Sequence, residues 1–155
     1  MKRFYDGLGL LGGVILAVMT GAVFLQVVLR YVFRIGLEGL DEVPRYLFVW
    51  LVMIGAAAAM ARGEHTALVY FRDRLGPVGR AALSILTTAL GMLLFLSMIR
   101  SSLVLVPNAN LQTSPGLRLP LGYVYAAVPV GAVLILLPMA RELWATWREL
   151  WPRRS

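Results

Sequence analysis

The sequence has no cysteine, a single histidine and few charged residues, which make up 15% of its 155 positions. Without cysteine, disulfide bonds, iron–sulfur ligation and thiolate catalysis are excluded. One histidine cannot supply a bis-histidine haem pair or a typical metal cluster. The sequence also lacks a G-x-S-x-G elbow, a phosphate-binding loop and an H-E-x-x-H helix. We therefore expect no cofactor, no metal site and no enzyme activity.

In place of charge, the chain has long apolar stretches, at residues 7–29, 46–61, 81–99 and 119–140. A globular domain has about 25% charged residues, and a helix needs about 20 apolar residues to cross the bilayer core. The pattern predicts an all-α integral membrane protein with four transmembrane helices in one membrane domain, residues 1–155. The first stretch is too long for a secretory signal, whose apolar region has about 7–15 residues.

The second apolar stretch is short and must begin earlier than its first apolar residue. Asp41 is a plausible N-cap, and Pro44 in the first turn loses no hydrogen bond. The predicted spans are therefore residues 7–29, 41–63, 81–100 and 119–140, followed by a tail at 141–155. Between the first two spans, "YVFRIG" and "EGLDE" mix aromatic, apolar and charged residues. This composition predicts an interfacial amphipathic segment.

The distribution of basic residues predicts the orientation. The amino end, the loop at 62–80 and the tail carry ten Lys and Arg residues, against five on the other side, where Arg100 is counted at the end of the third span. Because basic residues are enriched in cytoplasmic loops, both termini are predicted in the cytoplasm. The net charge of +7 is explained by anionic lipid headgroups, and no nucleic-acid partner is expected.

Within the predicted spans, no ionisable residue is expected at mid-depth, which argues against a pump or exchanger formed by this chain alone.

Pro129 and Pro138 in the fourth span each free a backbone carbonyl and should kink the helix unless a neighbour satisfies it. Small residues recur every four positions in the first span, a pattern of close helix packing. Packing within the chain and contact with another protein both remain open for this stripe, at Gly9, Gly13, Ala17 and Gly21.

The histidine lies in "MARGEHTALVYFRDRLG", residues 60–76, between the second and third apolar stretches. A histidine beside glutamate and arginine suggests acid–base chemistry in a soluble enzyme. At the end of a membrane helix, the imidazole of His65 is better explained by hydrogen bonds to the last carbonyls.

Three segments in order resemble the small membrane subunit of tripartite ATP-independent periplasmic (TRAP) transporters, the DctQ-like family. They are "RYVF", "DEVPRYLFVWLVMIGAAAAMARGEH" and "LQTSPGLRLPLGYVYAAVPVG", and the likeness covers roughly residues 28–135. The residues that carry it and are candidates for family-motif positions or for contacts with a partner or lipid are Arg30, Glu42, Arg45, Trp50, Gly55, Arg62, His65, Thr113, Pro115, Pro120 and Pro129.

The resemblance implies a sodium-coupled uptake system for organic acids in the bacterial inner membrane. Such small subunits pair with a large multi-span subunit that carries the substrate and sodium sites, and a periplasmic binding protein delivers the substrate. The small subunit is implied to be a scaffold among membrane lipids. Arg62 and His65 would then anchor one end of the second helix to lipid or to the large subunit, and Glu42 with Arg45 the other end.

Two alternatives come from other classes of protein. A small four-helix exporter would form a homo-oligomer around an acidic residue in the membrane, and the first span has no such residue. An orphan membrane enzyme would need a polar cluster within the spans, which the sequence does not contain.

Overall fold

The computed structural model describes residues 2–36, 38–62 and 76–150 of the chain, and it is helical. The helices are α1 (Lys2–Tyr31), α2 (Glu42–Ala61), α4 (Pro77–Asn110), α5 (Gly122–Tyr125) and α6 (Ala127–Leu150). Four segments are long and apolar enough to cross a membrane: Arg3–Tyr31, Glu42–Ala61, Ala82–Asn110 and Gly122–Arg148. The predicted fold class, an all-α protein with four long apolar helices, is confirmed.

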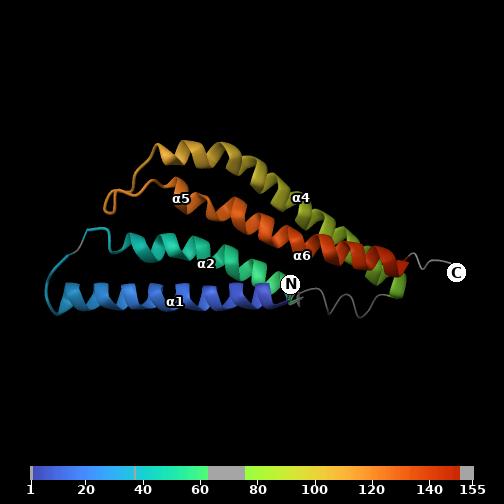
Figure 1. Cartoon of the computed structure of the whole chain (residues 1–155), viewed down its shortest axis with the longest axis horizontal. Coiled ribbons are helices and arrows are strands. Elements are labelled where there is room, and N and C mark those ends of the chain that lie inside the picture. The colour runs from blue at the N-terminus through green and yellow to red at the C-terminus, as the bar shows by residue number, and fades with distance from the viewer. Residues whose placement is uncertain (1, 37, 63–75, 151–155) are drawn as a thin grey trace.

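The long helices lie side by side in one layer, in the order α1, α2, α6, α4 (Figure 1). Both loop connections, residues 32–41 and 111–121, lie at one end of the layer, called here the connector end. The amino end of α1 and the carboxyl ends of α2 and α6 lie at the other, called the terminal end. Because α1 and α4 each pack along only one other long helix, only 6% of their apolar windows is buried, against 22% for α2 and 28% for α6.

The core lies between α2, α6 and α4, in the half of the layer nearer the terminal end. Ala57 and Met60 of α2 pack with Ile135 and Met139 of α6, and Met92, Phe95 and Leu134 pack against this group. Small residues allow α2 and α6 to approach closely, since Ala127 is fully buried and a Cβ added to Gly131 would lie 2.5 Å from Cβ of Met53. The middle helices therefore hold the layer together.

Several helix boundaries differ from the predicted spans. The first helix begins at Lys2, and α6 continues to Leu150, through most of the residues predicted as a tail. The third helix continues to Asn110, ten residues beyond the predicted end at residue 100, even though Pro107 inside it cannot donate to the carbonyl of Leu103. Arg100 consequently lies inside α4 and inside a segment that could span a membrane, ten residues before the end of the helix. The fourth helix is interrupted at Ala126, where the ring of Pro129 would crowd the carbonyl of Tyr125 in a continuous helix.

The connection between α1 and α2 is not helical where it is described, and its large apolar side chains Val32, Phe33 and Ile35 are exposed. Arg34 has a φ of 56°, so the chain reverses direction here through a left-handed residue. That these side chains lie at the membrane surface stays a prediction.

Candidate functional site

The buried carboxylate of Glu42 ties the two connections together at the connector end. Glu42 is in the first turn of α2 and is only 5% exposed. Its two carboxylate oxygens accept hydrogen bonds from the backbone N–H of Gly116, at 3.0 Å, and of Leu117, at 3.1 Å. The hydroxyl groups of Ser114 and Tyr46 face the same carboxylate. Hydrogen bonds to an ionised acceptor are among the stronger ones in proteins, so this contact fixes the start of α2.

The loop that presents these donors is closed by its own hydrogen bonds. The backbone N–H of Ser114 donates to the carbonyl of Leu119 at 2.9 Å, and the N–H of Leu119 donates to the Ser114 hydroxyl oxygen at 3.2 Å. Thr113 and Pro120 form an isolated antiparallel bridge just outside this pair. Ser114 is 1% exposed. The loop is thus a rigid platform whose amides point at the carboxylate.

Two glycines allow the backbones of the two connections to touch. Gly39 has a φ of 91°, which side-chain-bearing residues rarely adopt. A Cβ there would lie 2.9 Å from the carbonyl carbon of Gly116, and a Cβ on Gly116 would lie 2.5 Å from the backbone nitrogen of Gly39. We call the group of Gly39, Glu42, Ser114, Gly116 and Leu117 the connector clamp.

A second link lies nearer the terminal end, between the first helix and α6. The hydroxyl of Tyr5 donates to the backbone carbonyl of Leu134 at 3.1 Å. Leu134 precedes Pro138 by four residues, so its carbonyl has lost its helical donor to the proline ring. Tyr5 supplies the missing donor, which is the neighbour that a membrane helix with an internal proline requires.

The small-residue stripe of α1 faces away from the rest of the chain along most of its length. A Cβ added to Gly13 or Gly21 would have no described atom within 4 Å, and Ala17 is exposed. At Gly9 it would lie 2.9 Å from a guanidinium nitrogen of Arg62. The close contact of α1 with α2 uses Gly12 instead, which is buried against Leu51. Within the described chain, three of the four stripe residues have no packing partner.

The other predicted candidates lie in different surroundings. Of the predicted pair Glu42 and Arg45, Glu42 is buried within the chain and only Arg45 is exposed to a partner or lipid. The hydrogen bonds that the Glu42 carboxylate accepts from backbone amides of a distant loop were not predicted. Trp50 and Pro129 are half-buried, whereas Gly55 and Pro115 are exposed. His65 lies outside the described residues. Arg30 lines a cavity of about 480 Å³ at the connector end, with Gln26, Leu29, Ile35, Gly36, Leu40 and Asp41.

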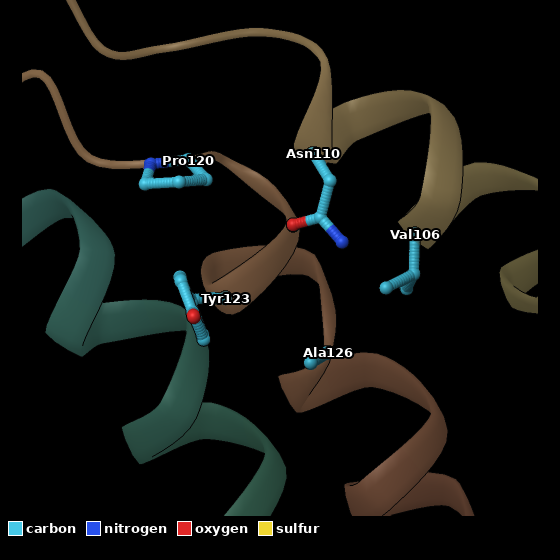
Figure 2. A pocket seen from close by; sticks show the side chains of 6 residues that line it. Val106, Asn110, Pro120, Tyr123 and Ala126 are labelled. Carbon is cyan, nitrogen blue, oxygen red and sulfur yellow. The ribbon is translucent and has the colours of Figure 1, made fainter.

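Pro120 lines a second cavity, of about 380 Å³, between the end of α4 and the start of the fourth apolar segment. Figure 2 shows its wall, formed by Val106, Asn110, Tyr123 and Ala126 together with the proline ring. The Asn110 side chain lies over Gly122, where a Cβ would collide with its amide. The cavity offers an amide, a phenol and apolar surface, and no carboxylate, imidazole or basic group lines it.

Several residues of these contacts were missed by the sequence reasoning, namely Tyr5, Gly39, Ser114 and Gly116. "SPG" and "EGLDE" signal turns, but no local pattern indicates that these two turns meet. Pro138 did signal a free carbonyl, although not which side chain would reach it. Among the described residues, no group of three or more His, Asp and Glu could hold a metal ion.

Comparison with known proteins agrees with this architecture. Residues 19–149 match the family model described as tripartite ATP-independent periplasmic transporters, DctQ component. The chain is 33% identical over 121 residues to a putative TRAP transporter small permease protein of Haemophilus influenzae, covering 78% of this chain and 75% of that protein. It is 32% identical over 120 residues to the C4-dicarboxylate TRAP transporter small permease protein DctQ of Rhodobacter capsulatus, covering 76% of this chain and about half, 53%, of that one.

An uncharacterized protein of Sinorhizobium fredii, y4mM, is 26% identical over 120 residues, and the match covers 77% of this chain and 22% of that protein. The family model matches well over half of the sequence, and it takes in the connector clamp, α4 and most of α6. The chain is a multi-pass membrane protein and a transporter subunit, not an enzyme. It belongs to the DctQ family of TRAP transporter small permease subunits.

Proposed function

We propose that this subunit is a fixed scaffold in a sodium-coupled TRAP importer of organic acids. It pairs with a large permease subunit, and a periplasmic binding protein delivers the substrate to the complex. The observation that carries the proposal is the single layer of helices, whose outer members are only 6% buried over their apolar windows. A layer this thin leaves both outer helices with broad apolar faces for a partner, while the connector clamp and Tyr5 hold its shape.

The stripe of α1 is the proposed contact for the large subunit. Small residues let helix backbones approach closely in lipid, where apolar burial alone gives little driving force for association. Gly13, Ala17 and Gly21 have no packing partner within the described chain, so their spacing is explained by a helix from another subunit. Exposed leucine, valine and phenylalanine side chains beside the stripe would contact the partner or membrane lipids.

The substrate class rests on the relatives. The Rhodobacter capsulatus protein is named for C4-dicarboxylates, and we propose a small organic acid of this kind for the present system. Sodium coupling is supported by the family resemblance. The expected location is the bacterial inner membrane with both termini in the cytoplasm. Once Arg100 is removed from the count, ten basic residues against four support this orientation.

The pairing is tested by purifying the tagged chain from its native membrane in mild detergent and identifying what accompanies it by mass spectrometry. A large multi-span subunit at a one-to-one ratio supports the proposal. Recovery of the chain only with copies of itself would contradict it.

The contact face is tested with Gly13→Leu, and Gly131→Leu is the matched control. At Gly13 the leucine has open space within the chain, so it should leave expression and thermal stability unchanged but lower the amount of co-purified large subunit severalfold. At Gly131 it would collide with Met53 and should destabilise the chain itself. If Gly13→Leu co-purifies the large subunit as well as the wild type does, the stripe is not the contact.

Transport is tested by reconstituting the purified complex in proteoliposomes with its binding protein. Uptake of a labelled C4-dicarboxylate should require an inward sodium gradient and fall to background when choline replaces sodium. Sodium-independent uptake would refute the proposed coupling.

A further inference from the structure

The depth of Arg100 in the layer follows from two contacts between α4 and the fourth apolar segment. At the connector end, Asn110 lies over Gly122, and nearer the terminal end Gly91 lies against Met139. Arg100 is ten residues from Asn110 and nine from Gly91 along α4. At about 1.5 Å per residue, Arg100 is about 15 Å along the helix axis from the level of the Asn110–Gly122 contact.

Between the levels of these two contacts, α5 and α6 form the apolar part of the fourth segment. From residue 122 to residue 140 it contains no charged side chain, and Arg141 follows. The hydrocarbon core of a bilayer is about 30 Å thick, so with the core centred on this apolar stretch Arg100 would lie near the mid-plane. At that depth an arginine side chain would cover only part of the distance to the headgroups, and the guanidinium would need a partner within the membrane.

The surroundings of Arg100 provide no counter-charge. Its side chain is exposed and makes no ion pair or hydrogen bond within the described part of the chain. Ser97 lies one turn before Arg100 on the same exposed face of α4, and its hydroxyl donates to the carbonyl of Leu94 at 2.7 Å. Ser101 follows Arg100 directly and is also exposed. The three residues form a polar patch, and the apolar side chains Leu93 and Val104 continue this face beyond it.

A second copy of this chain cannot neutralise Arg100 at the same depth. Of the eight acidic residues, Glu38, Asp41, Glu64, Asp73 and Glu149 lie outside the four segments that could span the membrane. Asp6 is three residues from the start of its segment, Glu42 is the first residue of its segment, and Glu142 is six residues from the end of its segment, so none is as far from an end as Arg100, which is ten residues from Asn110. A counter-charge at the depth of Arg100 is therefore expected from a different protein.

We propose that Arg100 pairs with a membrane-embedded aspartate or glutamate of the large permease subunit, with the hydroxyls of Ser97 and Ser101 beside the pair. An arginine guanidinium can donate two parallel hydrogen bonds to one carboxylate, which fixes the rotation and depth of the two helices relative to each other. The small-residue stripe of α1 gives close approach, whereas this pair gives specificity and register. The inference rests on the proposed function, because the partner is the large subunit of that transporter.

The first experiment locates the partner side chain. Ser101 is replaced by the photo-crosslinking residue benzoylphenylalanine in the tagged chain, co-expressed with its cognate large subunit and irradiated in membranes. The cross-linked peptide should come from an apolar helix of the large subunit with an Asp or Glu within about one helical turn of the attachment point. A cross-link only to lipid, or to a helix without an acidic residue, would overturn the inference.

The second experiment measures the pair by co-purification. Arg100→Leu should lower the recovered large subunit about tenfold, because the partner carboxylate is left unpaired in hydrocarbon. Arg100→Lys should keep about half, since an ammonium replaces the charge but not the two parallel donors. Arg148→Leu, which removes the same charge from an exposed site beyond the apolar stretch, should leave recovery unchanged.

The decisive variant replaces both partners by leucine. Exchanging a buried ion pair for apolar residues of similar volume is often neutral, so recovery should return to within about twofold of the wild type. If Arg100→Leu recovers as much large subunit as the wild type, the pairing is wrong while the scaffold function stands. If the wild type itself recovers no large subunit, the proposed function fails and this inference with it.

Discussion

Replacing Gly39 by alanine should measure what the connector clamp contributes to stability. The φ of 91° is strained for any residue with a Cβ, at a cost of about 1–3 kcal/mol. The added Cβ would also lie 2.9 Å from the carbonyl carbon of Gly116 and 3.0 Å from the nitrogen of Leu117, both backbone atoms that cannot rotate away. Overpacking of this kind costs about another 1–3 kcal/mol. Together the two effects are on the order of 3 kcal/mol.

Thermal unfolding of the purified protein in detergent is the assay. For a chain of this size, 1 kcal/mol corresponds to about 2–4 °C, so Gly39→Ala should lower Tm by about 6–12 °C. Gly36→Ala is the matched control, because Gly36 is exposed, lies in the same connection and has no atom within 4 Å of an added Cβ. Its Tm should change by no more than about 2 °C.

A Gly39→Ala variant that melts within about 2 °C of the wild type would refute the reasoning. It would mean that the two connections move apart without loss. The double variant with Gly116→Ala adds a further check. Once the backbones have separated, the second alanine should cost much less than it does alone, since the two residues share one contact.

Three further predictions concern other contacts. Glu42→Ala leaves two backbone amides of the loop without their acceptor and should lower Tm at least as much as the glycine substitution; an unchanged melting curve would contradict the clamp. Tyr5→Phe keeps the ring but leaves the Leu134 carbonyl unsatisfied, so unfolding should be easier by about 1–3 kcal/mol, measured as a lower Tm. Cysteine placed at Arg118 should react with a membrane-impermeant maleimide in intact cells, and cysteine at Arg148 only after permeabilisation; the reverse pattern would invert the proposed orientation.

The helix boundaries show where local sequence is informative. Hydropathy alone predicts four helices, because a segment that crosses lipid must satisfy its backbone hydrogen bonds internally and expose apolar side chains. It does not find the end of α4, because Pro107, Asn108 and Asn110 read as a turn but are compatible with the last helical turns. That difference of ten residues moves Arg100 from the end of the third helix to its interior, and the interpretation of the residue changes with it.

The sequence by itself determined that this is a four-helix membrane protein, and its motifs indicated the DctQ family. Both depend on composition and on residues near each other in the chain. Only the tertiary structure decided that Glu42 is buried under a loop more than seventy residues away, that Tyr5 satisfies the carbonyl freed by Pro138, and that the α1 stripe faces outward. These contacts depend on which helices become neighbours in the layer, and hydropathy cannot specify neighbours because all four spans are apolar enough to face lipid.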